Sequence, residues 1–64
     1  MESKATGAIQ RLRVLRGSFQ AAHAAGMAAL EAGDMEGFGK AIATERAILD
    51  EQELVYSELL KAQA

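Results

Sequence analysis

The spacing of apolar residues along the chain predicts two long helices. From residue 5 to residue 29, small and apolar residues recur at alternating intervals of three and four, the spacing of the inward positions of a heptad repeat. From residue 38 to residue 59, a broader apolar stripe follows helical spacing. We therefore predict one helix over about residues 3–32 and a second over about residues 35–63. The first stripe consists of Ala5, Ala8, Leu12, Leu15, Phe19, Ala22, Gly26 and Ala29, and the second of Phe38, Ala41, Ile42, Ile48, Leu49, Val55, Tyr56 and Leu59.

The segment between the two stripes predicts a tight turn. Gly33 is suited to the left-handed backbone conformation that ends a helix, and Asp34 can cap the N-terminus of the next one. Glu36 places a further negative charge at the positive end of that helix. We expect an all-α fold in which residues 1–64 form a single antiparallel helical hairpin, with its turn at residues 33–34. Gly37 and Gly39 permit either close packing or a hinge just beyond the turn.

A hairpin with this turn predicts a polar layer in the middle of the seam between the helices. Residues whose numbers sum to about 68 would face each other, and the pairs found in this way are apolar at both ends of the hairpin and polar in its middle. Polar groups at inward positions disfavour slippage of one helix along the other. The predicted pairs are Ile9 with Leu59, Arg16 with Gln52, His23 with Glu45, and Leu30 with Phe38.

His23 allows two other interpretations. Two copies of His23 and Glu45 could approach a metal ion in a dimer, but Gln20 stands where carboxylate-bridged bundles have a glutamate three residues before the histidine. His23 is also the only histidine, so its protonation could act as a pH switch in an interface. We expect the register-setting role, with no metal and no cofactor.

The distribution of small residues predicts a second polypeptide. The segment "AAHAAGMAAL", residues 21–30, is small on nearly every side, so a helix there can approach two neighbours, whereas a hairpin supplies one. Val14, Leu54 and Leu60 lie off the intramolecular stripes and would otherwise face water. We expect a homodimeric four-helix bundle, or a hairpin completed by an amphipathic helix of another protein. The residues expected to form the interface are Leu12, Leu15, Phe19, Ala22, Gly26, Ile48, Val55 and Leu59.

Composition and charge agree with this need for a partner. The chain has 64 residues, half of them apolar, and no cysteine, so it has a small core and no disulfide to reinforce it. The net charge is −2, with basic residues concentrated in the first half and acidic residues in the second, so the halves attract each other when folded back. The longest uncharged stretch is too short to span a bilayer, and we expect a soluble, cytoplasmic protein.

Motifs that would indicate catalysis are absent from the sequence. There is no glycine-rich phosphate loop, no nucleophile paired with a base and no isolated pair of carboxylates, and a hairpin offers no concave pocket, so we expect no enzyme activity. The basic cluster "RLRVLR", residues 11–16, forms no single stripe and has no aromatic residue for base stacking. An RNA-binding hairpin dimer on the plan of Rop is the alternative that this cluster leaves open.

The stretch "MAALEAGDMEGFGKAIATERAILDEQ", residues 27–52, resembles the helix–turn–helix core of flagellar export chaperones of the FliT and FlgN type. The likeness lies in a helix that ends in a leucine and a Gly-Asp turn, followed by a helix with a charged residue and then paired apolar residues, here "GD", "ER" and "ILDEQ". The resemblance implies a cytoplasmic chaperone that shields an amphipathic segment of a partner. Three hypotheses follow: a helix-binding chaperone or adaptor, a structural homodimerisation module, and an RNA-binding hairpin dimer.

Overall fold

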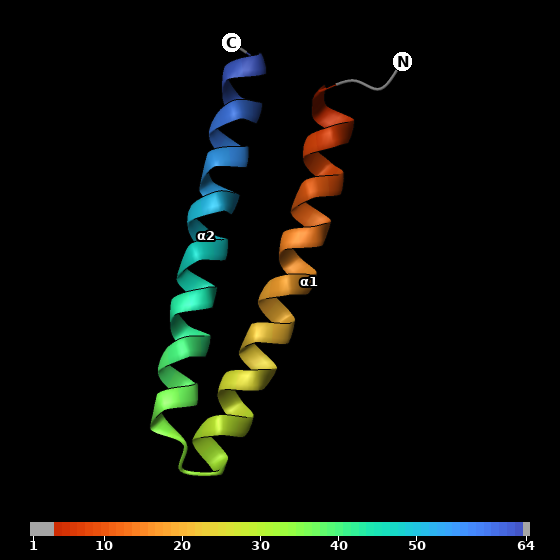
Figure 1. Ribbon diagram of the computed structural model, residues 1–64. Coiled ribbons are helices and arrows are strands. Elements are labelled where there is room, and N and C mark those ends of the chain that lie inside the picture. Colours follow the sequence, from red (N-terminus) through yellow and green to blue (C-terminus); the bar gives the residue numbers. More distant parts are fainter. Residues whose placement is uncertain (1–3, 64) are drawn as a thin grey trace.

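The chain forms two α-helices packed against each other as an antiparallel hairpin (Figure 1). The computed structural model describes residues 4–63. Helix α1 spans Lys4–Glu31 and helix α2 spans Met35–Gln63, and the ends opposite the turn lie side by side. The hairpin measures 47 × 18 × 10 Å, so it is a flat slab one helix thick with two broad faces. Every residue therefore lies close to a surface.

The turn between the helices is made by two residues with different tasks. Gly33 has a φ of 75°, a value that residues with a side chain rarely adopt. Its amide donates a hydrogen bond to the Leu30 carbonyl at 3.1 Å. The amide of Asp34 donates to the Ala29 carbonyl at 2.8 Å. These two bonds form the Schellman ending of α1 and satisfy carbonyls that would otherwise lack a partner.

Asp34 also begins α2. Its Oδ1 accepts a hydrogen bond from the amide of Gly37 at 2.9 Å, and its backbone carbonyl accepts from the amide of Phe38 at 3.0 Å. The side chain is thus the N-cap of α2, and its negative charge lies at the positive end of the helix dipole. Asp34 therefore forms hydrogen bonds with the end of α1 and with the start of α2. This double use explains why the turn is so short.

The seam between the helices is a heptad seam along both of them. In α1 the less exposed positions run from Ala8 to Ala29 at alternating intervals of four and three, as the sequence predicts. The core cluster consists of Leu15, Ile48 and Val55, with partly buried neighbours from α1 around it. Nearer the turn, Gly26 is buried, and a β-carbon built on it would lie 3.1 Å from that of Ala41. The helices therefore approach closely where a glycine meets an alanine.

The register differs from the expected one by a single residue. Gly26 and Ala41 meet across the seam, and their numbers sum to 67 rather than 68. One residue corresponds to a rotation of about 100° around a helix, so the α1 members of the predicted pairs lie at the edge of the seam. Ile9 is 47% exposed and Leu30 is 44% exposed, and Arg16 is also exposed. Ile9, Arg16 and Leu30 therefore lie outside the seam, contrary to the prediction. The predicted pairing of His23 with Glu45 is confirmed, with Nδ1 of His23 3.5 Å from Oε1 of Glu45.

The apolar stripe predicted for α2 contains two kinds of residue. Ala41, Ile48 and Val55 are buried against α1. Leu49 and Tyr56 are 47% and 48% exposed, so the prediction that they share this role is wrong. They follow the buried Ile48 and Val55 by one residue, which turns them towards one edge of the seam.

Candidate protein–protein interface

The two broad faces of the hairpin differ in chemistry because different heptad rows border them. The inward residues of a heptad repeat alternate between two positions, a and d, and in α2 the d positions include Ala41, Ile48 and Val55. In an antiparallel pair, the residues that directly follow the d positions lie along the same edge of the seam in both helices. In α2 this row is Met35, Ile42, Leu49 and Tyr56, spaced by seven and entirely apolar. A second row lies beside this one. It consists of the residues that directly follow the inward a positions, and it includes Leu60.

Most of the exposed large apolar side chains gather on this side. Among the residues that the structure describes, nine large apolar side chains are exposed. Seven of the nine occupy the two rows just described, in α1 or in α2, and Val14 and Leu54 lie elsewhere. A soluble monomer rarely concentrates so many apolar groups on one side. We call this surface the apolar face, formed by Ile9, Met27, Leu30, Met35, Leu49, Tyr56 and Leu60, with the half-buried Ile42 between them.

The middle of the apolar face is polar on α1, where Arg13, Arg16, Gln20 and His23 occupy its two rows. The side chain of His23 is 61% exposed, and its Nδ1 lies 3.5 Å from Oε1 of Glu45, whose side chain is only 13% exposed. The imidazole ring also stacks on Phe19, with ring centroids 6.2 Å apart and an angle of 8° between the rings. Glu45 thus lies inside the seam and His23 covers it from the edge. The predicted polar layer is therefore divided, because Glu45 and Gln52 are half-buried in α2, whereas Arg16 and His23 are exposed on α1.

The opposite broad face is mixed, because the exposed Val14 and Leu54 lie on it beside charged and polar residues. Arg11 forms an ion pair with Glu51 across the seam, and both residues directly precede inward positions. The side chains are 58% and 41% exposed, so this pair lies in a solvated environment and contributes little to stability. Thr44 and Glu58 occupy the same row of α2 as Glu51. The two faces therefore differ in their share of large apolar side chains, seven on one and two on the other among the described residues.

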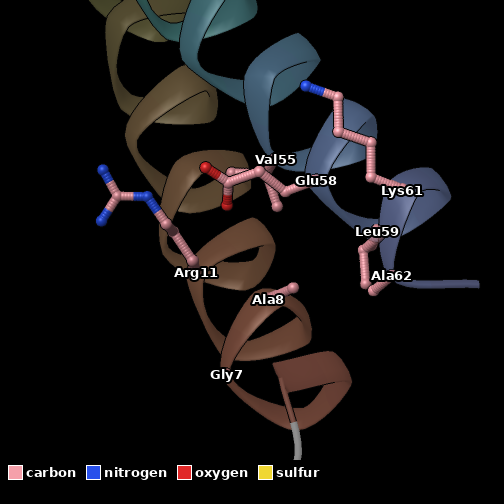
Figure 2. A pocket seen from close by; sticks show the side chains of 8 residues that line it. All are labelled: Gly7, Ala8, Arg11, Val55, Glu58, Leu59, Lys61 and Ala62. Carbon is pink, nitrogen blue, oxygen red and sulfur yellow. The ribbon is translucent and has the colours of Figure 1, made fainter.

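A depression of about 660 Å³ lies at the end of the hairpin away from the turn. Figure 2 shows Ala8 directed towards α2, with Leu59 and Ala62 on the facing helix and the charged groups of Arg11 and Glu58 at the margin. The small side chain of Ala8 leaves the space between the helices incompletely filled here. Because the depression is open to solvent and lined by mobile charged side chains, it lacks the enclosure of a ligand pocket.

The predicted interface residues all lie on the inner side of the hairpin. Four of them are buried between α1 and α2, so a partner could reach only the outer edges of the remainder. The buried ones are Leu15, Gly26, Ile48 and Val55, and the half-buried ones are Leu12, Phe19, Ala22 and Leu59.

The residues that sequence reasoning missed are those of the continuous row on α2. Their signal is the spacing of seven from Met35 through Ile42 and Leu49 to Tyr56, beside a separate inward row. The stripe predicted to pack inside the hairpin includes Ile42, Leu49 and Tyr56, so it does not distinguish a separate outward row.

Other candidate chemistry finds no assembled site in the described part of the chain. Within residues 4–63, no three histidine or acidic side chains come together as metal ligands would. Of the three clustered arginines, Arg11 lies at the face opposite the apolar face, whereas Arg13 and Arg16 occupy rows at the other edge of α1. Neither described helix has an apolar stretch of the length that crossing a membrane requires. Comparison of the chain with protein-family models, curated proteins and solved structures gives no match.

Proposed function

We propose that this chain is a non-enzymatic protein-interaction module that completes a helical bundle by packing its apolar face onto helices of a further polypeptide. The observation that carries the proposal is the concentration of seven of the nine exposed large apolar side chains of the described residues on one broad face. In bundle helices, apolar residues at both inward positions and at one flanking row are typical of a helix with two neighbours. From Met35 to Tyr56, helix α2 has apolar residues in one inward row and in one flanking row, while Glu45 and Gln52 interrupt the other inward row.

The small core supports the same function. In the described residues, only three large apolar side chains are buried, and none is less than 2% exposed. A core of this size seldom stabilises a chain of 64 residues without a metal, a disulfide or a partner. A helical partner on the apolar face would supply the missing burial. A chaperone or adaptor of the class implied by the FliT and FlgN resemblance and a homodimerisation module would both use this face.

The proposal is tested by asking whether the apolar face is covered in the source cell. The chain contains no cysteine, so a single substitution introduces one thiol. Leu60→Cys places it on the apolar face and Leu54→Cys places it off that face, at positions 70% and 65% exposed in the hairpin. A membrane-permeant maleimide should label Cys at position 60 at least about tenfold more slowly than at position 54. The reason is that a partner bound with ordinary affinity covers position 60 for most of the time. Equal labelling in cells would contradict the proposal, whatever the partner.

A further inference from the structure

We propose that the occupant of the apolar face is a second copy of this chain, related by a two-fold axis beside Leu49, so that α2 packs antiparallel to α2 of the other copy. The inference rests on the proposed function and names its partner. A face of 47 by 18 Å has a projected area of about 850 Å². Stable protein–protein interfaces bury about 800 Å² on each partner. One hairpin laid on another therefore supplies the area of a stable dimer.

Charges beside Leu49 are arranged as a two-fold axis requires. Arg46 lies three residues before Leu49 and Glu53 lies four residues after it, and both belong to the row next to the continuous apolar row. When two α2 helices run antiparallel about Leu49, Arg46 of each copy lies opposite Glu53 of the other. The arrangement forms two equivalent ion pairs from one surface, which is the self-complementarity of an isologous interface. Neither residue has an ion-pair partner among the described residues of its own hairpin.

The sizes of the side chains agree with the same register. It places Leu60, which is 70% exposed, opposite Gly39 of the second copy. Nothing lies within 4 Å of a β-carbon built on Gly39, so this position offers open space to a large side chain. Ile42 lies opposite Tyr56 in this register, an apolar pair of the kind that dominates interface cores.

The ends of α1 complete the interface. A two-fold axis perpendicular to the helices lays α1 over α1 of the second copy, also antiparallel. At matching heights along the helix axis, Ile9 of each copy then lies opposite the helical turn that carries Met27 and Leu30 of the other. The exposed apolar groups at both ends of α1 are thereby covered, and the same overlay brings Arg13, Arg16 and His23 of both copies into the middle of this contact. A single foreign helix would cover one groove of the face and leave apolar groups of the second helix in water.

The first test uses charge exchange with the purified chain. Arg46→Glu should weaken the dimer at least about tenfold in sedimentation equilibrium, because two attractions become two repulsions across the axis. Glu53→Arg should do the same, and the double variant Arg46→Glu/Glu53→Arg should restore the affinity. The rescue separates an effect on the interface from a failure to fold. Weak association in both single variants without recovery in the double variant would overturn the register.

The second test uses disulfide formation. Leu49→Cys places two thiols beside the axis, so mild oxidation should convert the dimer to a covalent species, whereas Leu54→Cys should remain uncrosslinked at equal concentration. In one outcome, the purified chain stays monomeric at high concentration while position 60 remains protected in cells. That result would contradict the second copy as the occupant and would leave the proposed function standing. Equal labelling of positions 60 and 54 in cells would overturn the proposed function itself.

Discussion

Gly37 and Gly39 lie two residues apart in the first turns of α2, and the same substitution should have opposite effects at the two positions. A β-carbon added at Gly37 would lie 2.9 Å from Cγ of Asp34 and closer still to its Oδ2. Rotation of the carboxylate about its own axis cannot relieve this contact, because Cγ itself is too close. The carboxylate must leave the position from which Oδ1 accepts the Gly37 amide. At Gly39 the added β-carbon meets nothing within 4 Å.

The magnitudes follow from two opposing contributions. Replacing glycine by alanine within a helix stabilises it by roughly 0.8–1 kcal/mol, because alanine loses less backbone entropy. Loss of an aspartate N-cap costs about 1 kcal/mol. In the monomeric hairpin, Gly39→Ala should therefore raise the free energy of unfolding by about 1 kcal/mol, whereas Gly37→Ala should leave it unchanged or lower it. In an Asp34→Ala background the cap is already absent, and both substitutions should stabilise the hairpin equally.

The assay is urea unfolding followed by circular dichroism at 222 nm, at one fixed chain concentration, since association would make stability depend on concentration. The double-mutant cycle of Asp34→Ala and Gly37→Ala should give a coupling free energy of about 1 kcal/mol, and the cycle with Gly39→Ala should give none. Equal stabilisation by the two glycine substitutions in the wild-type background would refute the reasoning. It would mean that the carboxylate contributes nothing as a cap.

Three further predictions concern the turn, the seam and the face opposite the apolar face. Gly33→Ala should lower the free energy of unfolding by about 1–2 kcal/mol in the same assay, because φ is 75° there, and an unchanged midpoint would place the left-handed residue elsewhere. Gly26→Ala should destabilise the hairpin, since its methyl group would lie 3.1 Å from the facing β-carbon, whereas Gly17→Ala, with open space, should stabilise it by roughly 1 kcal/mol. Glu51→Gln removes the exposed ion pair with Arg11 and should change the free energy of unfolding by less than about 1 kcal/mol, and a larger loss that persists in 1 M salt would contradict its solvated character.

The two helices and the turn could be predicted from sequence because their signals are local. Gly33 and Asp34 make their hydrogen bonds to residues three to five positions away, so the residue types themselves carry the information. The inward row of α1 was predicted for the same reason, since the spacing from Ala8 to Ala29 depends on one helix only. The observed bounds, Lys4–Glu31 and Met35–Gln63, lie close to the expected ones.

The division of apolar residues between the inside of the hairpin and its apolar face could not be predicted in this way. It depends on how α2 is rotated relative to α1, and a change of one residue in the register rotates the facing row by about 100°. Glu45 is half-buried in the seam although it is charged, whereas Leu49 is 47% exposed although it is apolar. The apolar stripe assigns Leu49 to the seam, whereas the polar layer already predicts Glu45 there. Only the packed pair of helices shows that Leu49 lies outside the seam.

The hydrogen bonds of the turn connect the two helix ends and so restrict the rotation of α2 relative to α1. The Asp34 amide is bonded to the carbonyl of Ala29 in α1, while the Asp34 side chain is bonded to the amide of Gly37 in α2. The rotational phase of α2 is thus linked to that of α1 through a single residue. With this phase, the charged rows of Glu51 and Glu58 border one broad face and the row of Leu49 and Tyr56 borders the other. A turn longer by one residue is expected to change this phase and with it the rows that border each broad face.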